Sequence, residues 1–193
     1  LGSLKPTDGT GDFTFSRGSN TSATRINEQG YIEKGYENTL LASNDFARDD
    51  SSYTITSGEQ GYDGTTDAWL VNKLVTGNAY FGKNGSVYTG VMTISFHLKA
   101  GTLDRLAIIT TGDYVVFDLA NVTATKFGGA PITQTIELVS GTTDWYRCSM
   151  VINRNETNNI LLKPYNTSNQ DAAGTIYIQD AMLNQGLVAY PYI

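Results

Sequence analysis

Several kinds of residue are scarce in this chain of 193 residues, and each scarcity excludes a class of protein. Cys148 is the only cysteine, so no disulfide can form within the chain and stability must come from a packed core. His97 is the only histidine, which rules out a histidine-rich zinc site. No apolar run approaches the ~20 residues of a membrane-spanning helix, and no signal peptide opens the chain, so we expect no membrane insertion.

Positive charge is also sparse. Lys and Arg number 13 against 19 Asp and Glu, which gives a formal net charge of −6. Nucleic acids and anionic membranes are held by clusters of Lys and Arg, and no such cluster is present, so the sequence predicts no nucleic-acid partner. Charged residues make up only 17%, and Asn, Thr, Ser and Gln supply much of the polarity. This composition is typical of an extracellular or virion setting.

Catalytic motifs are missing as well. There is no G-x-S-x-G nucleophile elbow, no alternating carboxylate pattern of the kind that glucanases use, and no phosphate-binding or dinucleotide-binding fingerprint. The sequence therefore predicts that the chain is not an enzyme.

What the chain does contain is a series of short strand signals. Met92, Ile94, Phe96 and Leu98 alternate with polar residues, which indicates one buried and one polar face. In WYRCSMVI, the residues Tyr146, Cys148, Met150 and Ile152 share the inward face, and Trp145, Arg147 and Ser149 share the other. Further strands are predicted around 114–119, 136–138 and 160–164, and turns at 82–85, 111–113, 128–129, 140–141 and 166–174. Many short strands separated by turns predict an all-β sandwich or barrel.

The chain divides into two parts of different character. Residues 1–37 are polar, Gly-rich and broken by turns, which predicts an extended N-terminal arm or connector with short strands at 13–15 and 31–33. Residues 38–193 carry the regular strand signals and form the predicted sandwich. This part ends with a strand, a turn at 184–186 and an extended aromatic tail that we expect to dock onto the sheet.

Five blocks of the sequence resemble known proteins. Four of them resemble carbohydrate-binding modules of the family 4/9 type, in the same order and spacing: NTLLASNDF with DGTTDAW (38–46 and 63–69), YTGVMTISFHLKAG (88–101), TDWYRCSMVI (143–152) and YIQDAMLNQG (177–186). A fifth block, FSRGSNTSATRINEQGYIE (15–33), resembles a connector of bacteriophage tail and virion-surface proteins that carry such a module.

The resemblance implies a jelly-roll β-sandwich of the galactose-binding-like type, made of two antiparallel sheets. It further implies a non-catalytic module of a phage tail or virion-surface protein that adsorbs to host-surface polysaccharide. Other virion proteins are then expected partners, and a homo-oligomer is consistent with that setting. Two alternatives stay open: a structural decoration or assembly domain without any ligand, and an accessory domain of a polysaccharide-degrading enzyme.

Saccharides are bound by aromatic faces together with planar polar side chains. His97 and Lys99 lie on the polar face of the central strand and are candidate contacts, although solvated residues on a sheet face would look the same. Further candidates lie in or beside predicted loops, where binding residues concentrate: Tyr62, Tyr80, Phe81 and Tyr114.

The two tryptophans are candidates with a structural alternative. Trp69 could stack on a sugar, but it stands inside a block that recurs for fold reasons in the resembling modules. The same holds for Trp145, on which the guanidinium of Arg147 could stack. Tyr190 and Tyr192 are expected to pin the tail.

Many modules of the resembling type hold a structural Ca²⁺ between the first and last strands, which implies Asp180 and Asp45 as ligands. Calcium requires six to eight oxygen ligands. Ala47 stands where an acidic residue usually follows the Phe of the opening block, and Asp49 and Asp50 are the nearest substitutes.

Overall fold

The computed structural model describes residues 24–26, 30, 32–34, 38–40 and 43–192. The chain separates into two compact units, Leu1–Glu37 and Asn38–Ile193. In the first unit, β1 (Thr24–Ile26) and β2 (Ile32–Lys34) pair as a two-stranded antiparallel sheet. The predicted strand at 13–15 lies outside the described residues.

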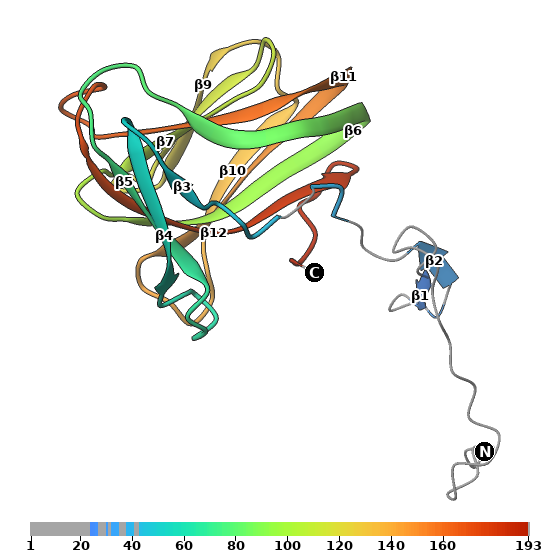
Figure 1. Ribbon diagram of the computed structural model, residues 1–193. Coiled ribbons are helices and arrows are strands. Elements are labelled where there is room, and N and C mark those ends of the chain that lie inside the picture. Colours follow the sequence, from blue (N-terminus) through green and yellow to red (C-terminus); the bar gives the residue numbers. More distant parts are fainter. Residues whose placement is uncertain (1–23, 27–29, 31, 35–37, 41–42, 193) are drawn as a thin grey trace, which may run out of the picture. The chain divides into compact units, whose positions relative to one another are not determined.

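The second unit holds ten strands in its described part (Figure 1). They are β3 (Arg48–Asp49), β4 (Tyr53–Glu59), β5 (Ala68–Lys73), β6 (Phe81–Ala100), β7 (Arg105–Ile109), β8 (Tyr114–Asp118), β9 (Thr123–Gly128), β10 (Thr133–Leu138), β11 (Trp145–Tyr165) and β12 (Gly174–Gln185). The described residues contain no helix, and therefore none that is long and apolar enough to cross a membrane.

Two long strands, β6 and β11, are shared by both layers of the sandwich (Figure 1). Residues 92–100 of β6 pair with β12, and residues 146–151 of β11 pair with β10, which completes a seven-stranded sheet in the order β3-β4-β5-β12-β6-β11-β10. β6 and β11 pair with each other along nearly their whole length. At its far end, residues 161–165, β11 also pairs with β7, which gives a five-stranded sheet in the order β6-β11-β7-β8-β9. The predicted all-β, jelly-roll-like sandwich is confirmed.

One apolar cluster fills the space between the two sheets. The alternation predicted for β6 places Ile94, Phe96 and Leu98 in it with no exposed surface, and Cys148 of β11 is equally buried. The five-stranded sheet contributes residues from β7 and β8, among them Leu106, Ile108, Val115 and Phe117. Burial of each large apolar side chain contributes about 1.5–3 kcal/mol, so this cluster is what makes a domain without a disulfide stable.

The prediction of a turn at 82–85 is wrong, because β6 runs without interruption from Phe81 to Ala100. Gly82 lies directly opposite β11, and a Cβ atom there would lie 2.1 Å from the carbonyl oxygen of Ile160. This glycine therefore permits close approach of two strands and does not mark a chain reversal. The strand predicted at 160–164 is likewise the second half of β11.

Candidate functional site

The outward face of the seven-stranded sheet is polar, yet much of it is buried. Thr93, Ser95 and His97 of β6 point away from the core, as predicted, but they are only 0%, 2% and 6% exposed. Ser149 of β11 and Gln179 of β12, which occupy the neighbouring strands, are buried as well. A buried polar sheet face must be covered by another part of the chain, and two segments cover this one.

The first covering segment is the loop between β4 and β5, residues 60–67, which we name the Tyr62 loop. The ring of Tyr62 stacks on the imidazole of His97, with a centroid distance of 3.9 Å and an interplanar angle of 23°. Its edge faces Trp145 at 6.3 Å, and its hydroxyl donates a hydrogen bond of 2.8 Å to Asp180 Oδ2. Tyr62 therefore occupies the middle of the sheet face.

The second covering segment is the C-terminal tail that follows β12. Arg147 donates to the carbonyl oxygen of Tyr190, and Asn184 donates to the carbonyl oxygen of Val188 at 2.9 Å. The hydroxyl of Tyr192 forms a 2.8 Å hydrogen bond with that of Ser43. The tail is thus docked onto the sheet and held there by hydrogen bonds of both its aromatic residues. This docking confirms the expected tail, but the turn expected at 184–186 is wrong in part, because β12 continues to Gln185, which pairs with Met92 of β6.

The Tyr62 loop is attached to the sheet mainly through Gln179. The side chain of Gln179 accepts from the backbone N–H of Tyr62 at 3.1 Å and donates to Asp67 at 2.6 Å. A Cβ atom on Gly61 would lie 2.3 Å from Gln179 Oε1, so a larger residue here would displace the Gln179 side chain that holds the loop. Within the loop, Asp63 accepts from both the N–H and the hydroxyl of Thr65, which rigidifies the turn.

Burial perturbs the titratable groups at this position. It lowers the pKa of His97 to about 3, and the positive charge of Arg147 acts in the same direction. It raises the pKa of Asp180 to about 6, although the hydrogen bond from Tyr62 opposes the rise. Burial and the Asp180 carboxylate together raise the pKa of Tyr62. At neutral pH the face therefore presents a neutral imidazole, a neutral phenol and a carboxylate that is predominantly ionised.

Three buried polar atoms around Tyr62 have no hydrogen-bond partner: Nδ1 of His97, Nε of Arg147 and Oδ1 of Asp180. A buried polar atom without a partner costs about 1–3 kcal/mol, so each of these three atoms lowers the stability of the closed arrangement. Asp180 also has a backbone φ of 55°, which few residues other than glycine and short polar ones adopt. It lies where the register of β12 against β6 shifts, between Gln179 and Met182.

Beside Tyr62 the sheet face opens into a pocket of about 300 Å³. Lys99 and Asp144 form an ion pair of 3.0 Å at this pocket, in which their side chains remain 32% and 52% exposed. The lining combines aromatic rings, a cation, a carboxylate, an amide and hydroxyls: Gln60, Gly61, Tyr62, Gly64, Lys99, Gly141, Thr142, Thr143, Asp144 and Trp145. A second pocket of about 220 Å³ lies between the tail and β10, beside Arg147 and Ser149.

The structure brings three of the predicted contact residues together and places the others elsewhere. Tyr62, His97 and Lys99 lie on the same sheet face, although the imidazole is covered by Tyr62. Phe81 is 3% exposed and packs against Tyr53 in the core at 5.3 Å. Its ring offers no surface to a ligand, so its assignment as a loop contact is corrected to a core residue.

The remaining aromatic candidates have other surroundings. Trp69 packs against the core, edge-on to Phe46 at 6.3 Å, and its Nε1 donates to the carbonyl oxygen of Asn44. Tyr114 is half-buried on the five-stranded sheet beside Phe127, at 5.8 Å, and the phenol of Tyr80 is close enough to raise its pKa beyond the effect of burial. Trp69, Tyr80 and Tyr114 therefore do not belong to the site around Tyr62.

The residues implied as calcium ligands do not gather into a ligand set in the part of the chain that the structure describes. Asp45 is exposed, and its Oδ1 accepts from the N–H of Ala47 at 3.1 Å. Asp180 offers one oxygen without a partner, against the six to eight that calcium requires. No group of three or more His, Cys, Asp or Glu side chains forms a metal site among the described residues. Calcium binding stays a prediction.

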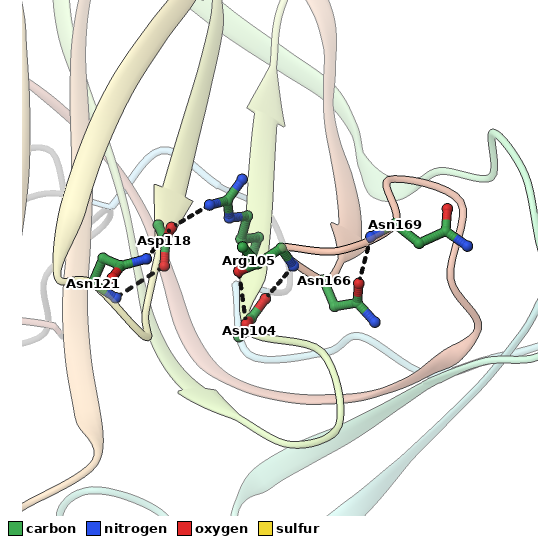
Figure 2. Close-up of polar contacts among 7 residues, drawn as sticks. Asp104, Arg105, Asp118, Asn121, Asn166 and Asn169 are labelled. Carbon is green, nitrogen blue, oxygen red and sulfur yellow. Dashed lines mark hydrogen bonds and ion pairs between the residues drawn. The ribbon is translucent and has the colours of Figure 1, made fainter.

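A different polar cluster lies at the ends of β7 and β8 (Figure 2). Asp118 accepts from Arg105 at 2.5 Å and from both the backbone and the side chain of Asn121. Asp104 accepts from the backbone N–H and the hydroxyl of Thr167, both at 2.9 Å. Both carboxylates are fully engaged in fixing the loops, so this cluster braces the end of the sandwich.

Sequence reasoning missed Gln179 among the residues that hold Tyr62 in place, and it named Asp180 only as an implied calcium ligand. Gln179 and Asp180 lie in a strand with alternating apolar residues, and nothing in that pattern signals the register shift that turns both toward the Tyr62 loop. The predicted stack of Arg147 on Trp145 is replaced by two other contacts, since Trp145 meets the edge of Tyr62 and Arg147 binds the tail.

No known protein-family model matches this sequence, and none of the curated proteins shows significant similarity to it.

Proposed function

We propose that this chain is a non-catalytic carbohydrate-binding module of a phage tail or virion-surface protein, and that it adsorbs to glycan on the host cell. The single observation that carries the proposal is the open pocket between the Tyr62 loop and residues 141–145. The sequence resemblance to carbohydrate-binding modules and to a phage connector supplies the biological setting.

The pocket has the chemistry that saccharide recognition requires. Since His97 covers one face of the Tyr62 ring, the other face is what the ring can present to the C–H groups of a sugar. Lys99 supplies hydrogen-bond donors, Asp144 supplies acceptors, and Gln60 supplies both. A ring of hydroxyls needs such a mixture of donors and acceptors beside an apolar surface.

The pocket is shallow and partly exposed, so the affinity of one site for a sugar is expected to be weak. Virions carry their surface proteins in many copies, and linked sites raise the overall affinity by ~10²–10⁴ over that of one site. The sequence contains no cluster of Lys and Arg, which fits a largely neutral polysaccharide as the partner.

The test is a glycan array probed with a multivalent form of the full chain. We expect binding to at least one bacterial surface polysaccharide, and loss of most of it in Lys99→Ala. Arg48→Ala is the matched control, because Arg48 also pairs with an aspartate at the surface, Asp50, but lies outside the pocket. Equal binding by the two variants would show that the pocket does not bind the glycan.

A structural virion domain without a ligand is the second candidate. The observation that favours it is the covering of the sheet face, whose centre is filled by Tyr62 and whose side is crossed by the tail. Absence of binding to every bacterial surface polysaccharide on the array, by wild type in multivalent form, would favour this candidate over the first.

A further inference from the structure

The Tyr62 loop closes over groups that are poorly satisfied in the closed arrangement. His97 and Asp180 are 6% and 3% exposed, and each has one polar atom without a partner. The unpartnered Nε of Arg147 belongs to the residue directly opposite His97 in the β6–β11 register. Three such atoms around one aromatic ring mean that covering this patch leaves hydrogen-bonding capacity unused.

The way in which the loop is attached permits it to move as a unit. The backbone hydrogen bonds seen for residues 61–65 close within the loop, from Gly61 to Thr65 at 2.9 Å and from Gly64 to Gly61 at 3.4 Å. Its bonds to β12 run through the side chains of Gln179 and Asp180. Lifting the loop therefore breaks side-chain contacts and leaves the ladder between β4 and β5 intact. Gly58 and Gly64, with φ of 104° and 82°, supply backbone freedom at the base and within the loop.

We propose that the Tyr62 loop is a displaceable lid over His97 and Asp180, and that a saccharide extends its contacts by lifting the Tyr62 ring off the imidazole. The inference rests on the proposed function for the identity of the ligand, but the motion of the lid is independent of it.

The uncovered groups fit a pair of neighbouring hydroxyls on a neutral sugar. The Nε–H of Arg147 donates to one hydroxyl oxygen, and Oδ1 of Asp180 accepts from a second hydroxyl. The imidazole of His97, which stacks on Tyr62 in the closed state, offers the same flat surface to a pyranose ring.

His97 is the only histidine in the chain, which makes it a specific probe of the lid. We would measure the acylation of His97 by diethyl pyrocarbonate in the full chain, using mass spectrometry of the modified peptide, over a series of low urea concentrations. A local lid opening predicts acylation of the native protein at a rate that does not change with urea below the unfolding transition. A rate that follows global unfolding throughout would overturn the lid.

Tyr62→Phe keeps the aromatic stack and removes the hydrogen bond to Asp180, so it should raise the His97 acylation rate about fivefold. Tyr53→Phe is the matched control, because it removes another tyrosine hydroxyl bond, to the carbonyl oxygen of Ala79, at the end of β4 opposite to the lid; we expect the wild-type rate. Equal rates in Tyr62→Phe and Tyr53→Phe would contradict the lid. If Tyr62→Phe does not fold, the urea series on wild type decides alone.

Glycan binding separates the two proposals. Lid opening in a protein that binds no glycan would support the lid and count against the proposed function alone. Glycan binding by a protein whose His97 stays protected until global unfolding would keep the proposed function and overturn the lid.

Discussion

Two buried carboxylates, one at each of the polar clusters, show how differently this molecule treats similar groups. Asp118, at the braced end of the five-stranded sheet, is 6% exposed, and Asp180, under the Tyr62 loop, is 3% exposed. Both oxygens of Asp118 accept hydrogen bonds, from Arg105 and Asn121 (Figure 2). Asp180 has one bonded oxygen, to Tyr62, and one without a partner.

The pKa values of the two groups follow from this difference. Burial alone would raise the pKa of Asp118, but the hydrogen bonds from Asn121 and the ion pair with Arg105 lower it below the ordinary value. Burial dominates at Asp180 and raises its pKa to about 6. A carboxylate that is fully bonded fixes the fold, whereas one that is buried with an oxygen to spare is available for recognition. Substitutions at the two clusters test this distinction.

The largest effect is expected for Asp118→Ala. It removes three hydrogen bonds and leaves Arg105 without its ion-pair partner, so the free energy of unfolding should fall by about 2–4 kcal/mol. Urea unfolding measures this change. A loss below about 1 kcal/mol would mean that the cluster of Figure 2 is not a brace.

Acidification is expected to destabilise the lid region through His97. The pKa of this histidine falls from 6.5 in the unfolded chain to about 3 in the folded one, so the unfolded state takes up the proton first. Stability is therefore complete above about pH 6.5 and falls as the pH drops toward 3. His97→Phe keeps a ring under Tyr62 and cannot titrate.

The matched measurement is the loss of unfolding free energy between pH 7 and pH 4 in wild type and in His97→Phe. Wild type should lose up to about 3 kcal/mol more than the variant, since one pKa unit corresponds to about 1.4 kcal/mol. Identical losses would show that His97 is accessible and protonates freely in the folded protein.

A smaller effect is expected for Asp180→Asn. The amide oxygen still accepts from the Tyr62 hydroxyl, and a buried charge is removed, so unfolding at pH 7 should differ from wild type by no more than about 1 kcal/mol. Glycan binding should nevertheless weaken, because the free carboxylate oxygen is lost. A destabilisation as large as that of Asp118→Ala would erase the contrast between the two carboxylates.

The smallest effect on stability is expected at the pocket rim. Lys99→Ala breaks an exposed ion pair with Asp144, and such pairs contribute about 0–1 kcal/mol. We therefore expect a thermal unfolding curve that overlays wild type while glycan binding falls. If the variant loses stability as well, its weaker glycan binding would be explained by unfolding and would not support the pocket as the binding site.

The sandwich could be predicted from the sequence because it depends on local alternation. The period of two in β6 and in the first half of β11 assigned Phe96 and Cys148 to the core, where both lie. The continuity of β6 and β11 could not be predicted. Residues 82–85 contain two glycines and an asparagine, which is typical of a turn, and the close contact at Gly82 comes from Ile160, on a strand that is distant in the sequence. For the same reason Phe81 was assigned to a loop.

The candidate site was predictable only in part. Tyr62, His97 and Lys99 were each identified from residue type and position, but their arrangement depends on a loop folding back over the sheet. Gln179 fixes that loop from more than a hundred residues away in the chain. A single sequence contains no signal for such a contact, so the covering of His97 emerged only from the structure.

The most direct test of the central claim is a crystal structure of the full chain soaked with an oligosaccharide selected on the array. We predict a sugar ring in the pocket between Tyr62 and Asp144, with the Tyr62 ring displaced from His97 and a sugar hydroxyl bound by Asp180. A glycan bound elsewhere on the molecule, with the Tyr62 ring still stacked on the imidazole, would contradict the account.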